Sequence, residues 1–264
     1  MLKMRVLTGI VGIPLLLFLV YMGGYWFGLI VLLISLIGLK EYYSLAHQTG
    51  WKALEFTGVF FLLPALLLVY KGNLTYILLL WLLFFIILSL FPVFFYSRVK
   101  YKEPAVVFWG VLYTGGLASF LVAIRLLPDG YLLTIFFLAL IWSTDICAYF
   151  VGTYFGKMPL APKISPKKTI EGTIGGLVGS VLTGMLLARF LPLPYLQVTT
   201  GAALGLIIGV VGALGDLTQS VLKRSANVKN SGNLLPGHGG ILDRFDSLLF
   251  AAPFFYFLLL FLTG

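Results

Sequence analysis

Charged side chains are scarce in this sequence. Only 10% of its 264 residues are charged and 60% are hydrophobic, whereas about a quarter of the residues are charged in a typical soluble domain. Apolar stretches of about 20 residues recur, which is long enough for a helix to cross a hydrocarbon core of about 30 Å. The composition therefore excludes an ordinary soluble domain and predicts an integral protein whose chain crosses a membrane many times.

Two further absences narrow the class. The apolar runs do not alternate with polar residues, which excludes a transmembrane β-barrel and favours helices. Cys147 is the only cysteine, so no disulfide can form within the chain. The opening run at 7–22 is as apolar as a signal peptide, but no small-residue cleavage site follows it. We therefore interpret it as the first membrane span.

The apolar runs predict an all-α polytopic fold with about nine transmembrane helices. The expected spans are 7–22, 25–46, 55–70, 74–96, 105–125, 131–151, 173–190, 198–222 and 247–263. If the N-terminus is cytoplasmic, only Lys71, Arg125 and Arg189 among all lysines and arginines fall on the outer side. This asymmetry follows the positive-inside rule and predicts that orientation. It also explains most of the net charge of +9, so the charge does not indicate nucleic-acid binding.

We expect residues 1–264 to form a single transmembrane domain in the cytoplasmic (inner) membrane. Within it, residues 1–130 are expected to be a scaffold that could supply dimer contacts. Residues 131–264 are expected to carry the functional site on the cytoplasmic side. The two longest inner loops, 152–172 and 223–246, lie in this second part.

Glycines recur every four residues in the seventh and eighth spans, for example at Gly201, Gly205 and Gly209. Such spacing lets two helix backbones approach closely in a membrane. It predicts tight packing of these two spans, and it also makes a homodimer an expectation. At Gly212 and Gly215 the alternative is a backbone kept bare for a ligand.

Acidic residues number only nine, and most of them gather at one edge of the predicted domain. Glu41, Glu55, Glu103 and Asp129 are expected at span ends or in loops, where they need no special role. A carboxylate near the centre of a membrane helix costs about 2.5–3.5 kcal/mol on insertion scales. The remaining acids must therefore be offset by lysines, arginines or a metal ion. They lie near the cytoplasmic ends of the last four spans: Asp145, Glu171, Asp216, Asp243 and Asp246.

The end of the eighth span places polar residues at helical spacing. Five of them are expected to share one helix face: Asp216, Ser220, Lys223, Arg224 and Asn227. Asp243 and Asp246, in the segment ILDRFDS, are i, i+3 neighbours if the ninth span begins there as a helix.

Three carboxylates from two helix ends are typical of a hard-cation site. Mg²⁺ binds one or two protein carboxylates together with waters and substrate phosphates, and the sequence has no Cys/His spacing of the kind that binds zinc. The alternative is that the aspartates pair internally with Lys223, Arg224 and Arg244.

The inner loops add groups that suit a phosphate ligand. In PGHGG (236–240), the bare backbone at Gly239 could donate N–H groups to phosphate oxygens, and His238 could donate a hydrogen bond or act as an acid. The inner loop 152–172 has four lysines that could line a polyphosphate site: Lys157, Lys163, Lys167 and Lys168. Alternatively, they only keep this loop on the cytoplasmic side and attract anionic lipids. Asp145 could order these lysines, bind the metal or contact a head group.

These residues together predict a cytoplasm-facing polar cavity with a lipid-accessible wall. It suits metal-assisted transfer at phosphorus, in which the protein positions charged groups and stabilises developing charge. A membrane transporter with a charged cavity is the alternative from another class. A transporter would predict polar groups at the membrane midplane and related halves, whereas here the acids lie at one edge and no internal repeat is evident.

The segment SVLKRSANVKNSGNLLPGHGGILDRFDS (220–247) closely resembles the signature of CDP-diacylglycerol synthases, also called phosphatidate cytidylyltransferases. That pattern has Ser, then Lys-Arg, then Lys-Asp, and ends in His-Gly-Gly followed by Asp-Arg, a hydrophobic residue and Asp. WSTDICAYFVGTYFGK and ISPKKTIEG are also similar to this family. The resemblance is specific over about 142–250, whereas the first half is similar only as generic membrane span.

The resemblance implies a nucleotidyltransferase of phospholipid biosynthesis. Its reaction joins CTP and phosphatidic acid to give CDP-diacylglycerol and pyrophosphate, by in-line attack of the lipid phosphate on the CTP α-phosphorus. It also implies Mg²⁺, with room for a second cation, held by Asp216, Asp243 and Asp246. Lys223, Arg224 and Arg244 are implied to bind phosphate groups in the catalytic centre. Substrate binding is expected at Lys167, Lys168, Ser220, Lys229, His238, Gly239 and Asp145.

Two positions depart from the family pattern. Asn230 stands where the pattern has Asp, and Gln219 stands where Glu is common. Each replaces an anion by a neutral amide of similar shape, and we expect Asn230 to weaken nucleotide or metal handling. Other lipid phosphotransferases fit less well, because the chain has neither a DDxxD motif nor a DGxxAR-type run.

Overall fold

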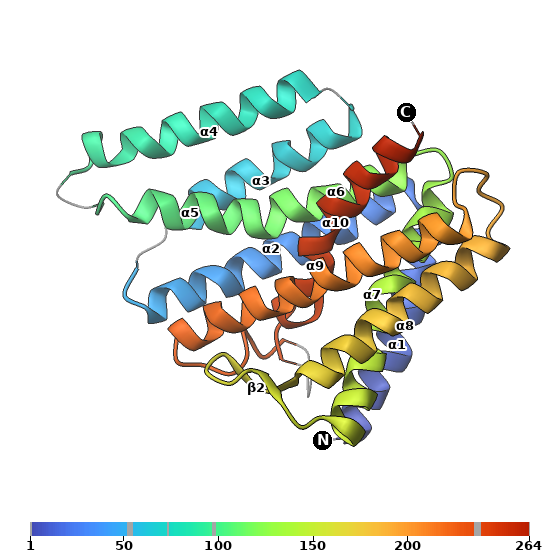
Figure 1. Cartoon of the computed structure of the whole chain (residues 1–264). Coiled ribbons are helices and arrows are strands. Elements are labelled where there is room, and N and C mark those ends of the chain that lie inside the picture. The colour runs from blue at the N-terminus through green and yellow to red at the C-terminus, as the bar shows by residue number, and fades with distance from the viewer. Residues whose placement is uncertain (1, 52–54, 73, 97–98, 235–238, 264) are drawn as a thin grey trace. The chain divides into compact units, whose positions relative to one another are not determined.

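The computed structural model describes residues 2–51, 55–72, 74–96, 99–234 and 239–263. Over these residues the secondary structure is helical apart from the connecting segments and one short hairpin (Figure 1). The helices before residue 127 are α1 (Leu2–Met22), α2 (Gly24–Gln48), α3 (Glu55–Tyr70), α4 (Leu74–Phe94), α5 (Glu103–Val111), the π-helix η1 (Leu112–Gly116) and α6 (Leu117–Leu126). Those that follow are α7 (Gly130–Phe155), α8 (Ile170–Phe190), α9 (Val198–Ser225) and α10 (Leu242–Thr263).

Each apolar run predicted as a membrane span coincides with a helix to within a few residues, the fifth with α5, η1 and α6 in succession. In the described part of the chain, 7 helices are long and apolar enough to cross a membrane: Gly24–Gln48, Thr75–Phe94, Glu103–Leu126, Gly130–Phe155, Ile170–Phe190, Val198–Ser225 and Leu242–Thr263. Two more apolar helices are shorter, Ile10–Met22 and Glu55–Tyr70. The all-α, multi-pass class is therefore confirmed.

The chain divides into two compact units. The first comprises Met1–Leu126 and Ser225–Arg244, and the second comprises Leu127–Arg224 and Phe245–Gly264. The signature segment 220–247 is thus divided between the two units, with most of it packing in the first. In that first unit, α2 contacts α3, α5, η1 and α6, and an aromatic cluster joins Phe61 of α3 to Trp81 and Phe84 of α4.

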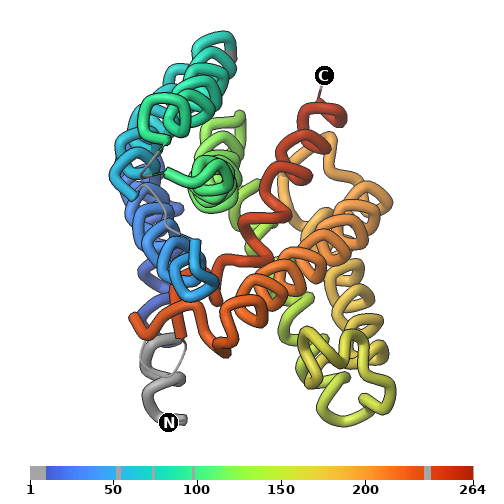
Figure 2. Tube along the Cα trace, turned by 90° about the vertical axis from the view of Figure 1, so that its left-hand side faces the viewer, coloured from blue at the N-terminus to red at the C-terminus, as the bar shows by residue number. Residues whose placement is uncertain are grey.

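In the second unit α7 and α8 run side by side, as Figures 1 and 2 both show. Small residues let the next helix approach as well. Gly184 of α8 and Gly201 of α9 lie backbone against backbone, and a Cβ at Gly205 would come within 2.5 Å of the Ser180 carbonyl oxygen. The predicted tight packing of the seventh and eighth spans, here α8 and α9, is confirmed.

The segment between α7 and α8 departs from the expectation that the chain has no sheet. Strand β1 (Pro159–Ala161) pairs antiparallel with β2 (Ser165–Thr169) at the end of these two helices (Figure 1). The Glu171 carboxylate closes the base of this hairpin by accepting the backbone N–H groups of Lys157 and Met158. Because the strands are short and lie outside the apolar runs, membrane-span periodicity could not indicate them.

Candidate functional site

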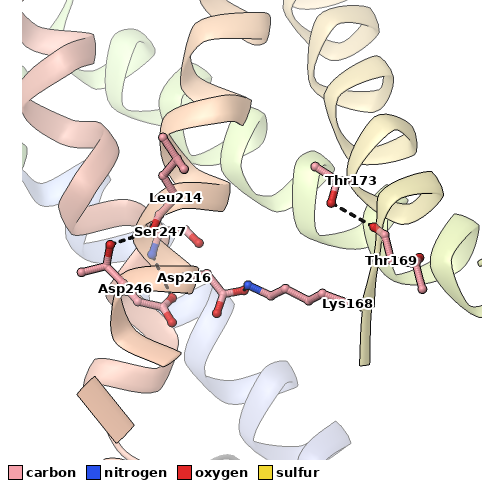
Figure 3. Close-up of polar contacts among 8 residues, drawn as sticks. Lys168, Thr169, Thr173, Leu214, Asp216, Asp246 and Ser247 are labelled. Carbon is pink, nitrogen blue, oxygen red and sulfur yellow. Dashed lines mark hydrogen bonds and ion pairs between the residues drawn. The ribbon is translucent and has the colours of Figure 1, made fainter. Parts of the chain in front are cut away.

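A lysine and an aspartate meet where the hairpin approaches α9. Lys168 extends from β2 toward Asp216 of α9, and its Nζ lies 2.5 Å from Asp216 Oδ2 (Figure 3). The two side chains are only 26% and 34% exposed, so bulk water screens the pair incompletely. Lys167 is exposed. Side chains on a strand alternate between faces, so only one of these two adjacent lysines points toward Asp216.

Asp246 supplies a buried carboxylate beside this pair. It lies one turn into α10, is only 7% exposed, and accepts the Ser247 backbone N–H at 2.8 Å (Figure 3). The carboxylates of Asp216 and Asp145 and the ammonium group of Lys223 lie within electrostatic range of it. Burying a carboxylate near two like charges is unfavourable unless a cation offsets them.

Glycine brings α10 close enough to α9 for this arrangement. A Cβ at Gly215 would lie 2.8 Å from the Asp246 carbonyl oxygen, and one at Gly212 would lie 3.6 Å from Ser247 Cβ. These two glycines were alternatively expected to leave backbone bare for a ligand. In the structure the space beside Gly215 is filled by α10, and the space beside Gly212 is filled by Ile141 of α7 and by α10.

The other predicted residues of the second unit occupy different environments. Asp145 is exposed on α7, Ser220 is buried on α9, and Lys223 is half-buried one turn later. Arg224 is exposed, and its Nε donates to the Ile164 carbonyl oxygen at 3.0 Å, which ties the end of α9 to the hairpin. Lys157 and Lys163 are exposed.

The predicted polar face of α9 is wrong at its last member. The helix ends at Ser225, and Asn227 adopts a left-handed conformation with φ of 56°. Asn tolerates this conformation and commonly ends a helix in this way. Asn227 therefore does not continue the face that carries Asp216 and Ser220.

The first unit holds the remaining part of the signature. Asp243, in the first turn of α10, accepts the backbone N–H groups of Ser231 at 2.9 Å and Gly240 at 3.0 Å, both through Oδ2. Gly239 has a φ of +88°, and a Cβ there would lie 2.7 Å from Asp243 Oδ2, so this position requires glycine. Lys229 and Arg244 are exposed. His238 lies outside the described residues.

Glu41 corrects a prediction. It was expected at a span end with no special role, yet it is only 8% exposed. Its carboxylate accepts the backbone N–H groups of Ile241 and Leu242 and the hydroxyl of Ser231. Its partners lie about 200 positions away, so no local pattern could have identified them.

The donor set at Asp216 and Asp246 fits a Mg²⁺ ion. Within the described ranges no group of three or more His, Cys, Asp or Glu side chains could hold a metal by itself. Mg²⁺ needs only one or two protein carboxylates, since waters and substrate phosphates complete its coordination. A buried carboxylate with a second one nearby, and oxygen as the donor atom, matches that requirement.

The fold and these residues define a multi-pass membrane protein with one buried acid, a partly buried Lys–Asp pair and further, more exposed charged groups near the ends of its last helices. The chain matches the Cytidylyltransferase family over residues 3–262. It is 37% identical to a protein named Phosphatidate cytidylyltransferase from Bacillus subtilis, over 97% of each chain. It is also 36% identical to one of the same name from Synechocystis sp., over 96% of this chain and 94% of the relative.

The chain therefore belongs to the cytidylyltransferase family and is a nucleotidyltransferase enzyme. The match also corrects one expectation. The resemblance was expected to be specific only over about 142–250, whereas the family match includes the first half of the chain. Glu41 lies in that first half, within the matched residues.

Proposed function

We propose that this protein transfers the cytidylyl group of CTP to phosphatidic acid, giving CDP-diacylglycerol and pyrophosphate. The observation that carries the proposal is the buried carboxylate of Asp246 beside the Lys168–Asp216 pair, in a chain of this family. The names of the two relatives supply the lipid substrate. A transporter is not favoured, because the family match is to cytidylyltransferases.

In the proposed reaction the lipid phosphate oxygen attacks the α-phosphorus of CTP, and the bond to the pyrophosphate oxygen breaks. The attacking group is already an anion, so no strong general base is needed. The main task of the protein is to neutralise and orient several phosphate groups. We assign Lys223, Arg224 and Arg244 to phosphate contacts. We assign Lys168 to a contact that it exchanges, from Asp216 to a substrate phosphate.

We propose that Asp216, Asp243 and Asp246 take part in binding Mg²⁺ and a second cation, with waters and substrate phosphates as further ligands, since among the described residues these carboxylates do not form one metal site by themselves. When bound, Mg²⁺ draws negative charge from the phosphate oxygens and so stabilises the charge that develops on the leaving group. Asp243 Oδ2 already accepts two backbone N–H groups, which fixes the orientation of this carboxylate. Asp243 and Asp246 lie about one helical turn apart in α10.

We further propose substrate contacts at Lys167, Ser220, Lys229, His238, Gly239 and Asp145. The described members are not equivalent, since Ser220 is buried whereas Lys167, Lys229 and Asp145 are exposed. Exposed lysines suit recruitment of an anionic nucleotide from solution. A buried hydroxyl suits a short hydrogen bond to a substrate already in place.

The proposed topology has nine crossings, a cytoplasmic N-terminus and the site on the inner face of the cytoplasmic membrane. Residues 1–130 would then be scaffold and residues 131–264 would carry the site. The charge asymmetry of the loops supports this arrangement. Because CTP does not cross membranes, sealed vesicles should use added CTP only when their cytoplasmic face is outward. Equal activity of sealed vesicles of the opposite orientation would contradict the proposal.

A homodimer is part of the proposal. The glycines that suggested it have partners inside the chain, since Gly201 lies against Gly184 and Gly205 against Ser180. Any dimer interface would therefore use other surfaces. The mass of the protein in detergent, measured by light scattering with correction for the micelle, would decide between one and two chains.

Purified protein is expected to form CDP-diacylglycerol from labelled CTP and phosphatidic acid. This reaction is expected to stop when EDTA removes divalent cations. Adding Mg²⁺ back should restore product formation, because a site rich in carboxylates cannot neutralise the phosphate charge unless Mg²⁺ is bound. Omitting phosphatidic acid is the matched control. Product that forms equally well in EDTA would contradict the metal part of the proposal, and absence of product under all conditions would contradict the reaction.

The variant Asn230→Asp is expected to raise turnover several-fold and to lower the Mg²⁺ concentration needed for half-maximal rate. The Cβ position of Gly239 lies 3.4 Å from Asn230 Cγ and 2.7 Å from Asp243 Oδ2, so a carboxylate at 230 would stand close to Asp243. An added anion there would strengthen cation binding. Asn233→Asp, an exposed change in the same loop, should have no such effect. Unchanged turnover and Mg²⁺ dependence in Asn230→Asp would refute this prediction.

A further inference from the structure

We propose that Glu41 is a positioning residue of the reaction, which acts by fixing the segment that carries Asp243. This inference rests on the proposed function, because it concerns a carboxylate assigned to the cation. It adds a residue from α2, far from the signature in sequence and outside every motif noted above. All the contacts that support it lie in the first unit.

Both oxygens of the Glu41 carboxylate accept hydrogen bonds. Oε1 accepts the Ile241 N–H at 2.9 Å, and Oε2 accepts the Leu242 N–H at 3.0 Å and the Ser231 hydroxyl at 2.8 Å. Ile241 and Leu242 stand at the start of α10, where backbone N–H groups have no partner within the helix. An anion at this end of a helix is also favoured by the helix dipole.

The surroundings leave Glu41 little freedom. A Cβ at Gly240 would overlap both the Glu41 carboxylate and the Ser231 hydroxyl, and a Cβ at Gly232 would lie 2.6 Å from Glu41 Oε1. One turn earlier on α2, Gly38 lies against Leu242, with 3.0 Å between its Cβ position and Leu242 Cδ2. This face of α2 therefore holds the start of α10 by both packing and hydrogen bonds.

Ser231 connects Glu41 to Asp243. The Ser231 hydroxyl donates to Glu41 Oε2, and the N–H of the same residue donates to Asp243 Oδ2. Gly240, which packs on Glu41, donates the second hydrogen bond to Asp243 Oδ2. Both residues that donate to Asp243 therefore contact Glu41, Ser231 by a hydrogen bond and Gly240 by packing. Through them Glu41 influences the orientation of a proposed metal ligand, as outer-shell groups do.

Replacing Glu41 by Gln should disturb this arrangement while preserving its shape. Each carboxylate oxygen of Glu41 faces at least one donor, so the amide NH₂ of Gln must face an N–H or O–H group. We expect Glu41→Gln to lower kcat by about 10- to 100-fold, the usual effect of losing such an outer partner. We also expect weaker Mn²⁺ binding, measured by EPR as a substitute for Mg²⁺, and faster hydrogen exchange at residues 241–242.

Glu103→Gln is the matched control, since Glu103 is another buried acid of the first unit at 4% exposure. It accepts the Lys100 N–H, and among the described residues it forms no hydrogen bond or ion pair with residues 231–243. Glu103→Gln should keep the parent's Mn²⁺ affinity, and exchange at residues 241–242 should be unchanged. The inference is overturned if Glu41→Gln has the same kcat and Mn²⁺ affinity as this control. It is also overturned if the loss of activity is explained entirely by a smaller amount of folded protein.

Ser231→Ala tests the same link without removing a charge. We expect a smaller loss of kcat from it, and little further loss when it is combined with Glu41→Gln, because both changes break one connection. If the effects of the two substitutions simply add, the connection through Ser231 is overturned. If Glu41→Gln does not fold, Ser231→Ala alone decides, and parent-like activity of Ser231→Ala would overturn the connection. If the parent forms no CDP-diacylglycerol, the proposed function fails, while Mn²⁺ affinity and exchange rates still decide the role of Glu41.

Discussion

Asp246→Asn is expected to lower kcat for CDP-diacylglycerol formation by at least about 100-fold, comparable to the loss of one charge-stabilising group at other phosphoryl- or acyl-transfer sites. Asn has the shape of Asp but no charge. Asp246 is buried, and the carboxylates of Asp216 and Asp145 lie nearby. Its negative charge is therefore favourable mainly when a bound cation offsets it. The measurement is the initial rate with labelled CTP at several Mg²⁺ concentrations.

The fold of Asp246→Asn should remain intact, because removing one of several neighbouring negative charges relieves repulsion. We expect its unfolding temperature to equal or exceed that of the parent. Asp129→Asn is the control, since it makes the same change just before the start of α7, at a left-handed residue that Asn tolerates. An active Asp246→Asn enzyme with normal Mg²⁺ dependence would show that this carboxylate is structural.

Lys168→Met is expected to reduce kcat/KM for CTP by about 100-fold, because it removes a cation that can exchange between Asp216 and a substrate phosphate. The side chain retains most of its length and apolar contacts. Lys167→Met provides an unusually close control. It is the adjacent residue of the same type on β2, but it is exposed and not paired with Asp216.

The two lysine variants should therefore separate clearly. Lys167→Met is expected to show only a small rise in KM for CTP, which high salt would also produce in the parent by screening an exposed charge. If both variants lose activity to the same extent, the lysines act as a general positive surface. If Lys168→Met is as active as the parent, the Lys168–Asp216 pair serves the fold alone.

The positions of the apolar helices could be predicted closely because helix length and hydrophobicity are local properties. A run such as 131–151 is predominantly apolar. In the bilayer core no water can pair with its backbone N–H and C=O groups, so these groups must pair with one another in a helix. The helix α7 extends to Phe155, beyond that run, and α10 begins at Leu242, before the apolar residues of its own span. The helix ends depend on caps and tertiary contacts that hydropathy does not contain.

The sequence indicated candidate site residues by their type but not by their contacts. Asp216 and Asp246 were recognised because acids are rare in apolar chains. That Lys168 rather than Lys167 meets Asp216 depends on the two-residue period of β2, in a hairpin that the composition did not predict. The wrong placement of Asn227 has the same origin, since a helical period says nothing about where the helix stops.

The sequence by itself determined the class of this protein, its apolar helices, and the signature by which it resembles cytidylyltransferases. Each of these depends on residues close together along the chain. Only the tertiary structure decided that Glu41 is a buried acceptor at the start of α10 and that Asp243 is oriented by Ser231 and Gly240. The energy of a buried carboxylate depends on the donors around it, and for Glu41 folding brings those donors from about 200 positions away.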